Sequence, residues 1–131
     1  TGGIMSLYVS MLREFNAKDW LRHTKLDGSV IGHNATLEIH HFFPRALLIK
    51  KGYETDLINT FANYVIISKD SNLNILDKEP HAYLKEEKVK NEELYKQCIP
   101  EDKELWKSKN YKKFLIERRK LLAERANNIF Y

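Results

Sequence analysis

Residues 37–45 read Leu-Glu-Ile-His-His-Phe-Phe-Pro-Arg, and residues 63–68 read Asn-Tyr-Val-Ile-Ile-Ser. The first stretch alternates apolar and polar side chains as a half-buried strand does, and Pro44 ends it because proline cannot donate a hydrogen bond to a neighbouring strand. The second stretch is rich in β-branched and aromatic side chains, which favour strands. The two stretches therefore predict two short β-strands.

Helical patterns surround the two predicted strands on both sides. Apolar side chains at helical spacing, Pro at helix starts and capping residues predict the helices. The expected helical segments are residues 4–15, 45–50, 56–63, a short helix carrying Asn72 after Ser68 and Asp70, one that begins at Pro80, one that begins at Pro100, and 109–130. No internal repeat or linker separates them, so we expect a single α+β domain.

The composition narrows the protein class. The chain has 131 residues, 43% hydrophobic and 31% charged, which is typical of one globular domain. Cys98 is the one cysteine, so neither a disulfide framework nor a zinc site with two or four cysteines can form. The sequence lacks the run of about 20 apolar residues that spans a bilayer. We therefore expect a cytoplasmic protein without membrane contact.

The net charge of +4 is concentrated toward the C-terminus. Residues 1–88 hold 11 basic and 11 acidic side chains, whereas residues 89–131 hold 11 basic and 7 acidic ones. The segment 107–120 has seven basic residues and one acid, which suits either a polyanion or an ordinary solvated helix face. On the first interpretation, the candidate nucleic-acid contacts in this segment are Lys109, Lys112, Lys113 and Arg118.

His40 and His41 are the residues best suited to chemistry. Neighbouring side chains on a strand point to opposite faces, so the two imidazoles would have different tasks. One can ligate a divalent cation, and the other can accept a proton from water near neutral pH. An adjacent histidine pair by itself is more typical of structural histidines. The surrounding motifs must therefore show whether this pair is structural or catalytic.

Those motifs resemble the HNH nuclease family. The closer similarity is to the HNH branch at the C-terminus of GmrSD-type modification-dependent restriction enzymes and related phage-defence proteins. Four stretches carry it in the family's order: His40-His41-Phe42-Phe43-Pro44, Phe61-Ala62-Asn63-Tyr64, Ser71-Asn72 and Lys78-Glu79-Pro80-His81-Ala82-Tyr83-Leu84. The resemblance implies a ββα-metal core over residues 37–88, with a helical lead-in over 1–36 and C-terminal helices over 89–131.

The resemblance also implies a site and a reaction. His41 would be the general base of phosphodiester hydrolysis, and Asn63 would brace the loop between the strands so that the His41 ring faces the phosphate. His40 and Asn72 would hold one divalent metal ion. Mg²⁺ is the expected ion, but His40 replaces the family's more usual Asp, so Mn²⁺, Ni²⁺ or Zn²⁺ also fit. The products would carry 5′-phosphate and 3′-hydroxyl ends.

DNA is the expected partner, with Arg45 and Lys78 as further phosphate contacts beside the site. The chain begins Thr1-Gly2-Gly3 without Met, so we expect it to be the C-terminal part of a longer prokaryotic defence protein whose upstream domain senses DNA or hydrolyses a nucleotide. Two alternatives remain open. One is a catalytically silent module that keeps the fold to bind nucleic acid or a partner, and the other is a bacterial toxin domain that nicks DNA.

Overall fold

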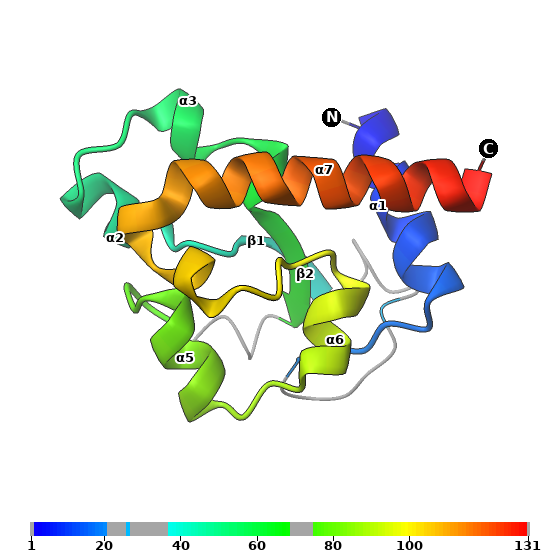
Figure 1. Ribbon diagram of the computed structural model, residues 1–131, viewed down its shortest axis with the longest axis horizontal. Coiled ribbons are helices and arrows are strands. Elements are labelled where there is room, and N and C mark those ends of the chain that lie inside the picture. Colours follow the sequence, from blue (N-terminus) through cyan, green and yellow to red (C-terminus); the bar gives the residue numbers. More distant parts are fainter. Residues whose placement is uncertain (1, 21–25, 27–36, 69–74, 131) are drawn as a thin grey trace.

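Two antiparallel strands form the sheet at the centre of the computed structural model (Figure 1). The residues described are 2–20, 26, 37–68 and 75–130. Strand β1 (Leu37–His41) pairs with β2 (Tyr64–Ser68), and His41 lies opposite Tyr64. Both predicted strands are confirmed. The second begins one residue later than predicted because Asn63 closes a turn of 3-10 helix.

Helices account for most of the remaining described residues, so the α+β class is confirmed. The helices are α1 (Gly2–Glu14), α2 (Arg45–Lys50), α3 (Thr55–Ile58), α5 (Pro80–Glu86), α6 (Asn91–Lys96) and α7 (Tyr111–Phe130), with 3-10 turns η1 (Phe61–Asn63), η2 (Lys103–Trp106) and η3 (Ser108–Asn110). The helix predicted over 56–63 divides into α3 and η1. The helix predicted to carry Asn72 lies outside the described residues.

Strand β2 is buried on both faces and lies between two hydrophobic clusters. Val65 and Ile67 belong to the larger cluster, whereas Ile66 belongs to the smaller one. This division follows from the alternation of side chains along a strand. It explains why four consecutive residues of β2 are buried and why the sequence there is almost wholly apolar.

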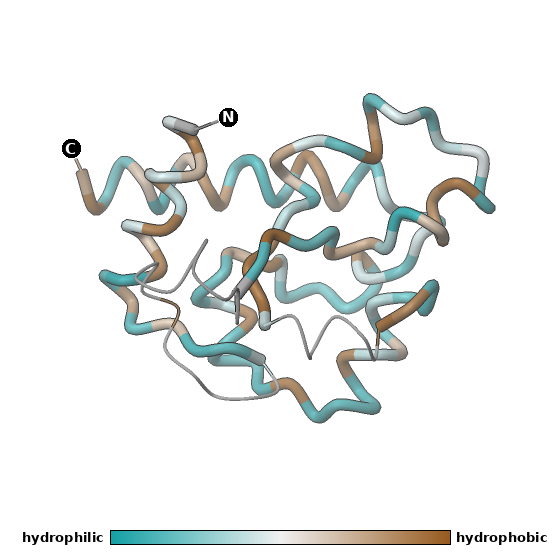
Figure 2. The backbone as a smooth tube through the Cα atoms, turned by 180° about the vertical axis from the view of Figure 1, so that it is seen from behind, coloured by the Kyte–Doolittle hydropathy of each residue, from teal (hydrophilic) through white to brown (hydrophobic). Residues whose placement is uncertain are grey.

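Helix α7 runs along the length of the molecule and covers both clusters (Figure 1). Phe114 lies in the larger cluster and Leu122 in the smaller, where α1 packs against α7. Hydrophilic and hydrophobic positions alternate along α7, as expected for a helix with one buried stripe (Figure 2). Across the described part of the chain, α7 included, we find no helix long and apolar enough to cross a membrane.

Aromatic rings attach the end of β1 to α7. Phe42 stacks on Phe114 with the ring centroids 5.0 Å apart and the planes at 7°. Phe43 meets Phe114 and Tyr111 edge to face, each at 5.0 Å. All four rings are at most 1% exposed. The residues that follow His41 are therefore anchored in the core.

Polar side chains complete the outer edge of β2. The side chain of Gln97 accepts a hydrogen bond from the Ile66 N–H at 3.0 Å and donates one to the Ile66 carbonyl at 2.7 Å. Asp19 accepts the Ser68 N–H, and Arg118 donates to the Tyr64 carbonyl at 2.5 Å. These bonds satisfy backbone groups that a third strand would otherwise occupy.

Candidate functional site

Asn63 ties the end of β1 to the start of β2. Its side chain is fully buried. The Oδ1 atom accepts a hydrogen bond from the Phe43 N–H at 2.8 Å, and Nδ2 donates to the carbonyls of Phe43 at 3.1 Å and Ile58 at 3.2 Å. Both Nδ2 protons and one Oδ1 lone pair are used, as expected for a buried amide. The chain after His41 and the chain before η1 are thus held together by one side chain.

Tyr83 of α5 binds the neighbouring residue, Phe42. Its hydroxyl donates to the Phe42 carbonyl at 2.5 Å, and the Phe42 N–H donates to the Asn63 carbonyl at 2.7 Å. Burial raises the pKa of the Tyr83 hydroxyl, so it stays a donor at neutral pH. Tyr83 is buried. Both backbone groups of the residue after His41 are therefore fixed.

His41 is partly exposed at the end of β1. Its Nε2 atom lies 2.8 Å from Oδ1 of Asn59, and its ring meets the Tyr64 ring edge to face at 5.3 Å. Asn59 caps the C-terminus of α3 and is exposed. Asn59 was not among the predicted site residues, because an asparagine after a short helix is typical of a turn and nothing local indicates a contact 18 residues away.

His40 has a different environment. Its Nε2 atom is enclosed and has no hydrogen-bond partner among the described residues. Burial, with a smaller contribution from the nearby His41, lowers the pKa of His40 to about 4, so the ring is neutral at neutral pH. A neutral imidazole with a free nitrogen is what a metal ligand requires, so this residue fits a divalent ion. The second expected ligand, Asn72, lies outside the described residues.

A metal site could also be formed by a cluster of several side chains instead of the single imidazole of His40. Within the described ranges, no three His, Cys, Asp or Glu side chains lie together as a metal-binding group. The expected pair of His40 and Asn72 is not a group of that kind, since it contains one histidine and one amide.

The candidate phosphate contacts lie on the surface with one exception. Arg45 begins α2, directly after Pro44, and is exposed. Lys78 is partly exposed and forms an ion pair with Glu86 at 2.8 Å. Exposed side chains at the beginning of α7 and in η3 are Lys109, Lys112 and Lys113. Because Tyr111 contacts Phe43, these lysines lie at the same end of the molecule as Arg45.

The prediction that Arg118 contacts nucleic acid is wrong. Arg118 is fully buried, although it lies in the basic segment. Its guanidinium donates to four neutral oxygens: the carbonyls of Ala62 at 2.9 Å, Tyr64 at 2.5 Å and Gln97 at 3.1 Å, and the Tyr8 hydroxyl at 3.0 Å. Arg118 lies on the apolar stripe of α7, and this position in the helix indicates that its side chain is buried. Arg118 therefore supports the sheet and does not face a ligand.

Arg119, the next residue along α7, was not among the predicted contacts and lies close to the His41 region. It is exposed, and its Nη2 atom donates to Oγ1 of Thr60 at 3.3 Å. Thr60 follows Asn59, the partner of His41. An exposed cation on α7 therefore lies beside the segment that contacts His41, a proximity created by the packing of α7 on η1.

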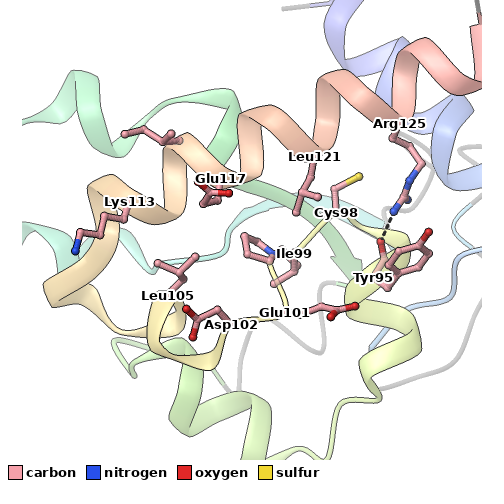
Figure 3. A pocket seen from close by; sticks show the side chains of 12 residues that line it. Tyr95, Cys98, Ile99, Glu101, Asp102, Leu105, Lys113, Glu117, Leu121 and Arg125 are labelled. Atoms are coloured by element: carbon pink, nitrogen blue, oxygen red, sulfur yellow. Dashed lines mark hydrogen bonds between the residues drawn. The ribbon is translucent and has the colours of Figure 1, made fainter.

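A cavity of about 600 Å³ lies away from this site, beneath α7 and between α6 and η2 (Figure 3). Lys113, Glu117 and Leu121 of α7 line one side, and Arg125 donates to the Tyr95 carbonyl at its end (Figure 3). Neither histidine of the candidate site is among its lining residues.

Comparisons with models of protein families, with curated proteins and with solved structures found no match for this chain.

Proposed function

We propose that this chain is a metal-dependent DNA endonuclease domain of the HNH type. The observation that carries the proposal is the position of Asn63, whose buried amide binds the backbone directly after the histidine pair. That is the bracing contact that the resemblance implies for the central asparagine. A partly exposed His41 and an enclosed, neutral His40 accompany it, so the two imidazoles differ as a base and a metal ligand should.

In the proposed reaction His41 accepts a proton from the attacking water. Asn63 and Tyr83 keep the backbone after His41 in place, so that the ring does not need to reorganise when the substrate binds. His40 and Asn72 would hold the divalent ion. When bound, that ion would neutralise charge on the scissile phosphate and on the leaving 3′ oxygen.

The backbone of the DNA would be bound by exposed cations at this end of the molecule. Arg45 lies four residues after His41, and Lys112 and Lys113 follow Tyr111, which packs against Phe43. Such contacts give affinity without reading base sequence, because they address phosphates alone. Any recognition of modified or specific DNA would come from an upstream domain of a longer defence protein.

Plasmid nicking tests the proposal directly. Purified protein is incubated with supercoiled DNA at low salt, with EDTA or with Mg²⁺, Mn²⁺ or Ni²⁺. We expect metal-dependent conversion to open circles or linear DNA, and loss of this activity in His41→Ala. The matched control is His81→Ala, because His81 is an exposed histidine on α5 outside the site. Equal cutting by His41→Ala and wild type would refute the assignment of the base.

A protein that binds DNA and cuts with none of the metals would favour the binding-module alternative. That outcome is separable from misfolding, because the core contacts of Phe42 and Phe114 produce dispersed aromatic and methyl signals in the NMR spectrum of a folded domain. Wild type that is folded, binds DNA and does not cut is therefore an informative negative result.

A further inference from the structure

The imidazole of His41 has one nitrogen engaged by another side chain. Nε2 lies 2.8 Å from Oδ1 of Asn59, within normal hydrogen-bond distance. An amide oxygen can only accept a hydrogen bond, so Nε2 must be the atom that carries the proton. A neutral imidazole has a single N–H, and the lone pair is then on Nδ1. The contact with Asn59 therefore selects one of the two tautomers of the ring.

Asn59 is held firmly enough to make this selection. Its backbone N–H donates to the Thr55 carbonyl at 2.8 Å, which closes the last turn of α3. The residue before it, Ile58, is buried, and its carbonyl accepts a hydrogen bond from Nδ2 of Asn63 at 3.2 Å. The residue after it, Thr60, accepts a hydrogen bond from Arg119. Asn59 is thus anchored through both neighbours.

Asn63 anchors both segments that take part in the contact between His41 and Asn59. Asn63 binds the backbone of Phe43, two residues after His41, and the carbonyl of Ile58, one residue before Asn59. One buried amide therefore sets the separation between the His41 ring and the Asn59 side chain. The arrangement joins segments that are 18 residues apart and leaves the Nδ1 side of the ring free of hydrogen bonds from the described residues.

We propose that Asn59 is a positioning residue for the reaction: it holds His41 in the tautomer protonated on Nε2, so that Nδ1 is the atom that accepts the proton from water. This inference rests on the proposed function, in which His41 is the general base. Asn59 itself touches no reacting atom. Its effect is on the orientation and the tautomer of the ring, as expected for a residue behind a catalytic histidine.

The first readout is the tautomer itself, from long-range ¹H–¹⁵N correlation NMR of the His41 ring at about pH 8, where an ordinary imidazole is neutral. We expect the wild type to be protonated on Nε2. Asn59→Asp should keep this tautomer, because a carboxylate oxygen accepts the same hydrogen bond. Asn59→Leu should weaken the preference toward the mixture of both tautomers that an unrestrained imidazole shows, in which Nε2–H is the major form and Nδ1–H is measurably populated. Asn128→Leu is the matched control, since Asn128 is exposed on α7 far along the chain from the site.

The second readout is nicking under single-turnover conditions. Asn59→Leu should lower the rate at saturating protein by about 10-fold or more, with little change in DNA affinity, because orientation of a catalytic histidine affects the chemical step. Asn128→Leu should cut as the wild type does. Reduced DNA affinity with an unchanged rate would overturn the inference, since it would make Asn59 a binding residue.

The two readouts separate this inference from the proposed function. A wild-type ring protonated on Nδ1, or a tautomer unchanged in Asn59→Leu, overturns the role of Asn59 even where His41→Ala abolishes cutting. Wild type that has the Nε2–H tautomer and cuts no DNA with any metal overturns the nuclease assignment, and with it the catalytic role of Asn59. A weaker tautomer preference together with a lower rate in Asn59→Leu, with Asn59→Asp retaining the tautomer, supports the inference.

Discussion

Asn63 and Phe43 exchange a pair of hydrogen bonds across 20 residues of chain: the Phe43 N–H donates to Oδ1 of Asn63, and Nδ2 of Asn63 donates to the Phe43 carbonyl. This pairing resembles the exchange between two backbone positions in an antiparallel ladder, with a side-chain amide in place of one of them. It extends the hairpin beyond the last paired residues, His41 and Tyr64. Stability and the candidate site therefore depend on the same amide.

Asn63→Asp should destabilise the protein without changing the size of the side chain. The carboxylate can still accept the Phe43 N–H, but it cannot donate to the carbonyls of Phe43 and Ile58, and it places a negative charge beside them. We expect the free energy of unfolding in urea to fall by about 2–4 kcal/mol. Asn128→Asp on the exposed end of α7 should change it by less than about 0.5 kcal/mol. Equal stability of the two variants would contradict the bracing role.

Arg118→Met should be strongly destabilising. Methionine keeps the apolar stem of the side chain but lacks the guanidinium, so it leaves the carbonyls of Ala62 and Tyr64 without their buried donor. We expect a loss of about 3 kcal/mol or more, measured by thermal or urea unfolding. Arg119→Met is the matched control, because Arg119 is the exposed neighbour and should cost less than about 1 kcal/mol. If both variants unfold alike, Arg118 does not support the sheet.

His40 should make the metal-free protein less stable as the pH falls. Burial, and then the nearby His41, lowers the pKa of His40 to about 4 in the folded state, below the ordinary value of about 6.5 in the unfolded chain. Protonation therefore favours the unfolded state. The stabilisation is fully present above about pH 6.5 and is lost as the pH falls toward 4, by about 3 kcal/mol at most.

Comparing the wild type with His40→Gln in EDTA isolates this contribution from that of the carboxylates. The difference in unfolding free energy between the two proteins should shift in favour of the variant as the pH is lowered from about 7 to about 4. A difference that stays constant over this range would mean that the pKa of His40 in the folded protein is not depressed.

Lys112 and Lys113 should contribute to DNA affinity through phosphate contacts. Replacing both with Gln should lower the slope of log affinity against log salt by about 2, measured by fluorescence anisotropy in EDTA so that no cutting occurs. Lys85→Gln with Lys88→Gln removes the same charge from exposed positions at and just beyond the end of α5. Equal slopes for the two double variants would show that net charge matters and that these lysines do not form a specific interface.

Much of the local structure could be predicted from the sequence because its signals are local. The apolar run at residues 64–68 predicted β2, Pro44 predicted the end of β1, and Pro80 predicted the start of α5. Apolar side chains at helical spacing predicted the last long helix, and the structure buries Tyr111, Phe114 and others of them in α7. The α+β class followed from the order of these elements.

Charge was the misleading signal in the basic segment. Arg118 and Arg119 are adjacent and chemically identical, yet one is fully buried and the other exposed. Only the rotation of α7 over the sheet separates them. A composition count treats both as candidate phosphate contacts, whereas the helical stripe already places Arg118 on the inner face.

The sequence by itself determined where strands and helices form, because strand alternation, proline and apolar periodicity act over a few residues. It also determined that the imidazoles of His40 and His41 are neighbours on one strand. The tertiary structure alone decided that Asn59 meets His41 and that Arg118 joins Tyr8 to β2. Each of these is a hydrogen bond of a side chain to a group far along the chain. Such bonds form when the core brings the partners together, so their geometry is a product of packing and has no local pattern in the sequence.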